Sequence, residues 1–184
     1  MAYQNKHDTS GINSRDGANA EEIFRNLAEK QGYEVVDATR NEQFAHIDFW
    51  LKKDGGKWGF EVKARKKLSR QSEEYDDSKF WCEWVGVSGK AGWLRTGSDF
   101  LAIEQENEFL IVDRKKLEKL AESLVDFTKV VDRAHKALNV TFRRFRRKDL
   151  LSIIETAKVR EITHKIWPKK IPKNDEPIKP STTP

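Results

Sequence analysis

The sequence predicts an α/β domain with a mixed β-sheet, because one helical segment is followed by a series of strand patterns and then by further helical periodicity. The first helix is expected over GANAEEIFRNLAEKQG, residues 17–32, where apolar residues recur at helical spacing and Gly32 stands where helices commonly end. Strand patterns then dominate residues 33–114. The length of 184 residues is enough for one domain with a substantial core and short for two.

The expected strands are short runs rich in aromatic and β-branched residues. Residues 44–65, FAHIDFWLKKDGGKWGFEVKAR, form the clearest pair, a hairpin joined at two glycines. Helices are expected over residues 115–126 and over DLLSIIETAK, residues 149–158, with Asp149 as the N-cap of the latter. The remaining expected strands are residues 33–38, 80–87, 99–105, 108–114 and 139–147.

Both ends of the chain lack apolar periodicity. Residues 1–16 are polar and are expected to form a flexible N-terminal arm. All five prolines follow Trp167, so residues 168–184 are predicted to be a disordered tail rich in Pro and Lys. One folded domain is therefore expected over residues 17–167.

Composition and charge exclude several classes of protein. The sequence has no run of eighteen apolar residues and no apolar signal region, so no membrane partner is expected and the default location is cytoplasmic. A lone Cys82 rules out a disulfide framework and a multi-cysteine zinc site. The net charge is +5, and positive residues gather in residues 63–70 and in RRFRRK, residues 143–148. Such clusters favour a polyanionic partner.

The hairpin brings acids and a lysine together. If the glycine pair at residues 55–56 forms a two-residue turn, Asp48 lies opposite Lys63. Asp48 and Glu61 are then diagonal neighbours, roughly 7 Å apart at the backbone, so their carboxylates can converge on one small cation. Strand parity separates a charged face from a core face. The charged face carries His46, Asp48, Trp50, Glu61 and Lys63.

The first helix offers a third acid. At about 100° per residue, Glu21 lies at the margin of the apolar stripe and Glu22 faces solvent. Oxygen ligands favour a hard cation such as Mg²⁺, with Mn²⁺ as a substitute. Such an ion can bind a phosphate oxygen and lower the pKa of a bound water during phosphodiester hydrolysis. Lys63, protonated beside these acids, is expected to position the water and stabilise charge rather than to act as a general base.

The motifs HIDF and FEVK resemble those of the PD-(D/E)XK nuclease superfamily, which pairs an Asp on one strand with an acid-x-Lys triplet on the next. Residues 17–67 are similar to the N-terminal half of archaeal-type Holliday junction resolvases, which begin with a Gly-Ala-x-Ala-Glu helix. The resemblance implies a restriction-endonuclease-like core, with a central mixed β-sheet flanked by helices, and a Mg²⁺-dependent endodeoxyribonuclease. Ile47 stands where the motif's name expects Pro, and the resolvase pattern ends after Lys67. The catalytic residues that the resemblance assigns are Glu21, Asp48, Glu61 and Lys63, the first three as metal ligands.

Other interpretations stay open at this point. An isolated acid-x-Lys triplet is commonly a surface ion pair, and a non-catalytic DNA-binding module would use the same basic residues. The DNA substrate is expected to be a Holliday junction or branched DNA, with duplex or single-stranded DNA as alternatives. Paired cuts in a junction predict a symmetric homodimer.

The basic segments are expected to contact DNA phosphates. GVSGKAGW, residues 86–93, lacks the spacing of a nucleotide-binding loop but is a glycine-rich loop that carries one lysine. For RRFRRK the alternative is a solvated strand with Phe142 and Phe145 packed inward. The expected DNA-binding residues are Arg65, Lys66, Lys67, Arg70, Lys90, Arg143, Arg144, Arg146 and Arg147.

Overall fold

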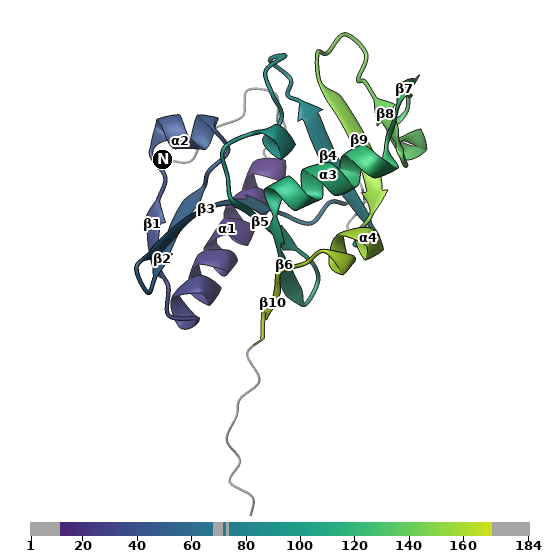
Figure 1. Cartoon of the computed structure of the whole chain (residues 1–184). Coiled ribbons are helices and arrows are strands. Elements are labelled where there is room, and N and C mark those ends of the chain that lie inside the picture. The colour runs from purple at the N-terminus through teal and green to yellow at the C-terminus, as the bar shows by residue number, and fades with distance from the viewer. Residues whose placement is uncertain (1–11, 68–71, 73, 171–184) are drawn as a thin grey trace, which may run out of the picture.

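A six-stranded mixed β-sheet forms the centre of the protein, whose computed structural model describes residues 12–67, 72 and 74–170 (Figure 1). The strand order is β1-β2-β3-β5-β6-β10. The pair β3 and β5 is parallel, and the other neighbouring pairs are antiparallel. The predicted α/β class with a central mixed sheet flanked by helices is confirmed. The strands are β1 (Glu34–Asp37), β2 (Phe49–Lys53), β3 (Gly56–Lys63), β5 (Phe100–Glu104), β6 (Glu108–Asp113) and β10 (Lys165–Pro168).

A second, four-stranded sheet packs beside the first, in the order β4-β9-β8-β7. Its pairs are antiparallel except for β7 with β8. A short 3-10 helix, η1 (Trp93–Arg95), follows the turn that ends β4, and a second, η2 (Ala134–Lys136), lies between β7 and β8. The strands are β4 (Lys79–Val85), β7 (Asp126–Val131), β8 (Val140–Phe142) and β9 (Leu150–Glu155).

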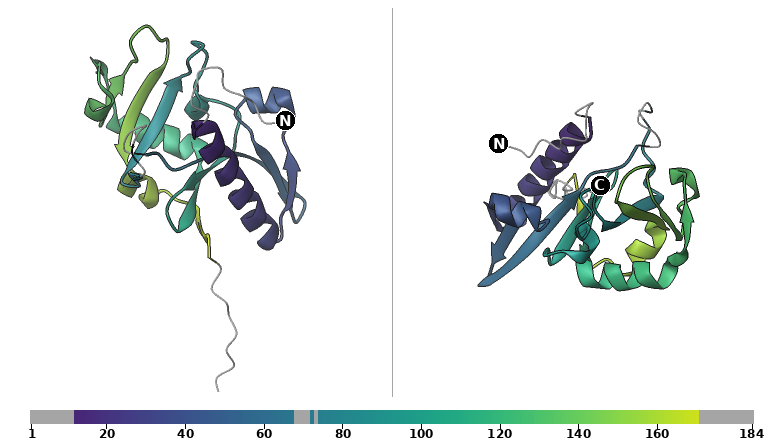
Figure 2. Two further views of the ribbon diagram at one scale, coloured as in Figure 1. Left: turned by 180° about the vertical axis from the view of Figure 1, so that it is seen from behind. Right: turned by 90° about the horizontal axis from the view of Figure 1, so that it is seen from above.

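The helices cover opposite faces of the central sheet. Figure 2 (right) shows α1 on one side of this sheet, with α3, α4 and the second sheet on the other side. One core cluster joins α1 to the central sheet, and another joins the opposite face of that sheet to β4, β9, α3 and α4. The helices are α1 (Ile12–Lys30), α2 (Arg40–Phe44), α3 (Arg114–Leu124) and α4 (Thr156–Glu161).

The hairpin between β2 and β3 turns one residue earlier than expected. Asp54 (φ 50°) and Gly55 (φ 80°) occupy the turn, since a two-residue hairpin of this type needs positive φ at both positions. Trp50 therefore pairs with Gly59 rather than with the expected Glu61. The register is displaced by two residues along β3, and because strand parity repeats every two residues, the charged face is preserved.

The segment DLLSIIETAK was expected to be a helix, and this prediction is wrong. Most of it forms strand β9, which pairs with β4 on one side and β8 on the other. Ser152 in this strand accepts a hydrogen bond from the buried Trp84 Nε1, at 2.9 Å. Asp149 is fully buried and ion-paired with Arg144, so it does not cap a helix. A short apolar run does not by itself distinguish a strand from a helix, and here the pairing on both sides decides.

The ends of the described chain also differ from expectation. Helix α1 begins at Ile12, so part of the expected arm, residues 12–16, is helical. Pro168 belongs to β10, which is an edge strand, where proline is tolerated. Residues 1–11 and 171–184, the rest of the expected arm and tail, lie outside the described residues. Within the described part of the chain, no helix has both the length and the hydrophobicity needed to cross a bilayer.

We expect Phe24→Ala to destabilise the fold strongly. Phe24 is fully buried between α1 and the sheet, and its ring lies 5.4 Å from those of Phe60 and Trp167. Truncation should lower the free energy of unfolding by about 3 to 5 kcal/mol, measured by urea denaturation. Ile166→Ala, on a side chain that is 48% exposed, is the control and should cost less than about 1 kcal/mol. Equal losses in the two variants would contradict this account of the core.

Candidate active site

Two carboxylates face each other at the open end of the β2–β3 hairpin. The observed register pairs Phe49 with Phe60, and Asp48 and Glu61 are the next residues along each chain beyond this pair. The Asp48 amide donates to the Phe60 carbonyl at 2.7 Å, and the Val62 amide donates to Asp48 Oδ2 at 2.7 Å. The sequence predicted a diagonal relation between the two acids, and in the structure the charge of Glu61 acts on Asp48.

Glu61 binds two basic groups through one oxygen. Lys63 Nζ donates to Glu61 Oε1, and His46 Nδ1 lies 3.4 Å from the same atom. Glu61 is only 5% exposed, so its charge depends on these partners. Lys63 Nζ also lies 5.0 Å from the ring centroid of Trp93, which limits where the ammonium can move. The predicted acid-x-Lys pair is therefore an ion pair with a buried carboxylate, and His46 lies beside it.

Helix α2 places His46 at the site. Thr39 and Glu42 form a capping box at its start, in which the Thr39 amide donates to Glu42 Oε2 at 2.7 Å. The other oxygen of Glu42 accepts from Trp50 Nε1 at 2.9 Å, which ties α2 to β2. The chain leaves the helix through His46 in a left-handed conformation (φ 58°). His46 therefore faces Glu61 because the helix is anchored at both ends.

Burial and like charge set the ionisation of the site. Burial, and then the charge of Glu61, raise the pKa of Asp48 to about 8. Burial also acts to raise the pKa of Glu61, but Lys63 and His46 outweigh it, and the pKa is lowered. Burial acts to lower the pKa of Lys63, but Glu61 and Asp48 outweigh it, and the pKa is raised. Lys63 therefore stays protonated, which suits charge stabilisation and not general-base catalysis.

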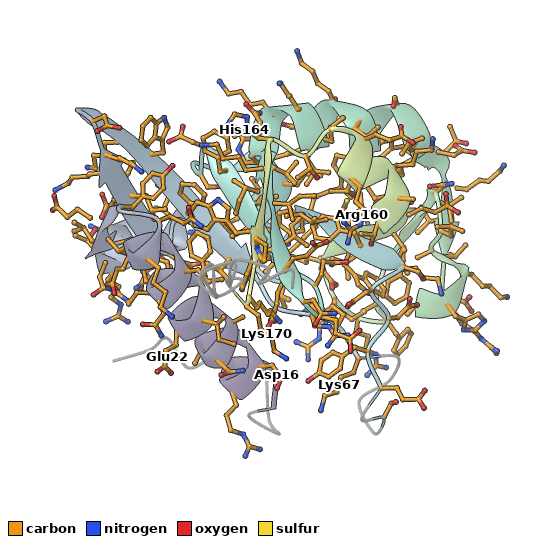
Figure 3. The ribbon with its side chains drawn as sticks, turned by 90° about the horizontal axis from the view of Figure 1, so that it is seen from below. Asp16, Glu22, Lys67, Arg160, His164 and Lys170 are labelled. Atoms are coloured by element: carbon orange, nitrogen blue, oxygen red, sulfur yellow. The ribbon has the colours of Figure 1, made fainter. Side chains whose placement is uncertain are left out.

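Glu21 and Glu22 differ as the helical spacing predicted. Glu21 is half-buried, and its pKa is raised first by burial and then by the charge of Glu61. Lys63 acts on the same carboxyl in the opposite direction, so Glu21 lies within electrostatic range of the site. Glu22 is exposed and points away from the sheets in Figure 3.

Glu83 is a further acid at the site that the sequence analysis did not single out. It lies on β4, in the second sheet, and accepts a hydrogen bond from the Trp93 amide. Burial raises its pKa, while Lys63 and His46 lower it. The signal in the sequence was a single acid within the apolar run FWCEWV, but no local pattern indicated which residues of the first sheet it would face.

The carboxylates provide the donor set that a hard cation prefers. Burial, and then the charge of Glu61, raise the pKa of Asp48, and a bound divalent cation would favour its ionised form. Among residues 15–67 and the later described residues, however, no three His, Cys, Asp or Glu side chains are grouped closely enough to hold a metal ion. Asp48, Glu61 and Glu21 thus supply oxygen donors of the type that Mg²⁺ prefers, but they do not form a preformed metal site, and Glu61 Oε1 is bound to Lys63 in this structure.

The basic residues that follow β3 are largely held by the protein itself. Arg65 Nε lies 2.8 Å from Asp77 Oδ1, and its guanidinium stacks over Tyr75. Lys67 also lies over Tyr75, at 5.5 Å from the ring centroid. Lys66 is exposed, and Arg70 lies outside the described residues. For Arg65, the structure therefore supplies a structural role beside the predicted contact with phosphate.

The other predicted DNA-binding residues gather on two neighbouring turns. Lys90 is exposed in the turn after β4, and Arg143, Arg146 and Arg147 are exposed in the loop between β8 and β9. Arg144 instead pairs with the buried Asp149. The predicted basic residues thus form two groups, one that follows β3 and one on the β4 turn and the β8–β9 loop.

We expect Asp48→Asn to stabilise the protein at high pH when no divalent cation is present. The pKa of Asp48 is raised to about 8 in the fold, so the folded state retains a proton that the unfolded state loses at lower pH. Stability should therefore fall as the pH rises from about 4 to about 8 in the native protein, and the variant should escape this loss. Urea denaturation should show a gain of about 1 to 3 kcal/mol for the variant at pH 8.5, shrinking toward pH 5.

The control for this measurement is Asp132→Asn, at an exposed position after β7. It should change the free energy of unfolding by less than about 0.5 kcal/mol at either pH. If Asp48→Asn increases the free energy of unfolding by the same amount at every pH, the Asp48 carboxyl does not have a raised pKa in the fold.

No protein-family model matches the chain, and no curated protein matches its sequence. Among solved structures, a bacterial homing endonuclease, I-Ssp6803I, is similar in fold, with a TM-score of 0.42 and 13% sequence identity. The superposed region covers 59% of this chain and 74% of the endonuclease chain. The chain thus has a partial structural similarity to a nuclease, and the resemblance of residues 17–67 to Holliday junction resolvases stays a prediction.

Proposed function

We propose that the protein is a metal-dependent DNA endonuclease that hydrolyses phosphodiester bonds. The observation that carries this proposal is the closeness of two carboxylates, the buried Glu61 on β3 and the half-buried Asp48 just before β2, with Lys63 bound to Glu61. An ordinary structural ion pair would need one acid, and a second, half-buried carboxylate with a raised pKa is a cost that a functional site explains.

Each residue of the site has a role that its environment supports. Asp48 and Glu61, with Glu21 as a supporting acid, would hold Mg²⁺ or Mn²⁺. When bound, such an ion stabilises negative charge on the phosphate and lowers the pKa of water. Lys63, protonated, would position the attacking water and stabilise the developing charge on the phosphate. His46 would hold the orientation of Glu61.

A Holliday junction or another branched DNA is our preferred substrate, and it rests on the resemblance of residues 17–67 to the junction resolvases. Duplex and single-stranded DNA are the alternatives. Paired cuts in a junction would require a symmetric homodimer, so that assembly is part of the proposal for this substrate. The basic residues on the β4 turn and the β8–β9 loop would hold the phosphate backbone.

A non-catalytic DNA-binding module is the second candidate. The observation that favours it is that Lys63 occupies Glu61 Oε1 and that the described residues contain no preformed group of three metal-binding side chains. In such a protein the ion pair would be structural, and binding would depend on the basic loops alone.

A cleavage assay distinguishes the endonuclease from the non-catalytic DNA-binding module. The substrates are a four-way junction, a plain duplex and single-stranded DNA, each with Mg²⁺ and with EDTA. We expect cutting that requires the metal and favours the branched substrate. Glu61→Ala should slow cutting by about 10³-fold or more while DNA binding persists, because binding depends on the basic residues. Tight binding without cutting of any substrate in Mg²⁺ or Mn²⁺ would establish the non-catalytic alternative.

Neighbouring acids on α1 supply a matched pair for the same assay. Glu21→Gln removes the acid that lies near the site and should slow cutting, whereas Glu22→Gln removes an exposed acid and should leave the rate within about twofold. If the two substitutions change the cutting rate equally, Glu21 has no role in the site.

Mg²⁺ binding should strengthen as the pH rises from about 6 to about 8. The pKa of Asp48 is raised to about 8, so at lower pH the carboxyl must lose a proton before it can hold a cation. For one proton, the apparent affinity can rise by up to about tenfold per pH unit. Isothermal titration calorimetry in two buffers of different ionisation enthalpy should show that the native protein releases a proton when it binds Mg²⁺. The Asp48→Asn variant should show no such proton release. Binding that is independent of pH would contradict a role for Asp48 as a ligand.

A further inference from the structure

Two turns meet to form a projection that we name the basic tip, made of residues 86–92 after β4 and residues 143–149 between β8 and β9. Figure 1 shows both turns extending side by side at the end of the molecule where α2 lies. Gly89 has a φ of 83°, and a Cβ at this position would lie only 3.0 Å from Lys148 Cδ. The two turns are therefore in contact, and the positive φ of residue 89 favours glycine in this turn.

The loop between β8 and β9 has a defined conformation. Arg144 is ion-paired with Asp149, which is fully buried at the start of β9. The Arg147 amide donates to the Arg144 carbonyl at 3.0 Å, and Arg146 between them adopts a φ of 56°. These contacts turn the chain sharply, so that the residue inside the turn, Phe145, cannot reach the core.

Phe145 is 84% exposed, which makes it the most exposed aromatic residue of the described chain. The alternative interpretation of RRFRRK, in which both phenylalanines pack inward, therefore does not hold for Phe145, whereas Phe142 does pack inward and is 7% exposed. Burial of an apolar side chain is favourable, and the folded protein forgoes this gain at Phe145. The Arg146 guanidinium lies against the ring, 5.0 Å from its centroid. One ring face is thus covered by a cation, and most of the side chain is open.

The positive charge around Phe145 favours a negatively charged binding partner. Residues 86–92 and 143–148 contain no acid, and Asp149 is buried against Arg144. Lys90, Arg143 and Lys148 are exposed on the same tip. An open aromatic ring among exposed cations matches a nucleic-acid strand, which presents phosphates and flat bases together.

The tip is also connected to the candidate active site. The β4 turn follows the strand that carries Glu83 and returns to Trp93. Glu83 interacts electrostatically with Lys63, and the Trp93 ring centroid lies 5.0 Å from Lys63 Nζ. A strand of DNA that extends from the tip along this turn would therefore approach Lys63.

We infer that Phe145 stacks on an unstacked base of the DNA substrate, while the surrounding cations bind the flanking phosphates. This inference rests on the proposed function and narrows its substrate class to DNA that contains an unpaired or unstacked base. Inserting a side chain into an intact duplex costs a few kcal/mol of unstacking, and this cost is smallest where a base is already unpaired. The tip thus supplies a physical reason for preferring a branch point over a plain duplex.

The experiment compares the native protein, Phe145→Ala and Phe145→Trp on DNA that carries 2-aminopurine at a branch point, and on the same label in an intact duplex. EDTA prevents cutting. The native protein should change the fluorescence of the branch-point label, and Phe145→Ala should lose this change and bind branched DNA about 5- to 100-fold more weakly. Its affinity for the intact duplex should stay within about twofold, and Phe145→Trp should restore both readouts. Ile166→Ala, exposed on β10, is the matched apolar control and should behave as the native protein does.

The outcomes distinguish this inference from the proposed function. If the native protein binds and cuts branched DNA and Phe145→Ala does the same with an unchanged fluorescence signal, the stacking role is refuted and the nuclease proposal stands. If Phe145→Ala loses the signal but the native protein cuts nothing in Mg²⁺ or Mn²⁺, the stacking role stands and the catalytic proposal fails. If the native protein binds no DNA, both fail.

Discussion

The structure depends on the placement of two carboxylates, Asp48 and Glu61, close together at one end of a hairpin. Removing either carboxylate from water is unfavourable, and their mutual repulsion adds to the free-energy cost. Lys63 and His46 lie against Glu61, whereas Asp48 accepts a hydrogen bond from the Val62 amide and has a pKa raised to about 8, first by burial and then by the charge of Glu61. A fold that only needed stability would place an apolar pair here, as at Phe49 and Phe60 one step along the hairpin.

This placement depends on elements that lie outside the hairpin. Helix α1 packs on one face and brings Glu21 to the sheet margin, while the capping box of α2 fixes the approach of His46. The second sheet and η1 close the opposite side, where Glu83 and Trp93 lie near Lys63. The site is thus assembled from four separate segments, and the stability of the surrounding core compensates for the buried charge.

The sequence predicts the local part of this arrangement well. Side-chain parity on β2 and β3, the angle of Glu21 on its helix and the acid-x-Lys spacing are all set by short-range geometry. The hairpin register was displaced by two residues because Asp-Gly-Gly offers two consecutive two-residue turns, and only cross-strand packing chooses between them. The strand β9 and the acid Glu83 were missed because both depend on pairing and contact between segments that lie far apart in the chain.

The distribution of positive charge suggests how a polyanion would approach. Arg65, next to the site in sequence, is paired with Asp77 and stacked on Tyr75, so its charge is largely compensated within the protein. Lys90, Arg143 and Lys148 are exposed on the basic tip, which has no exposed acid, so their charge can attract phosphates over a Debye length of about 8 Å at physiological salt. Because the β4 turn connects Glu83, which interacts electrostatically with Lys63, to Trp93, whose ring lies beside Lys63, DNA attracted at the tip would be guided along this turn toward the hairpin.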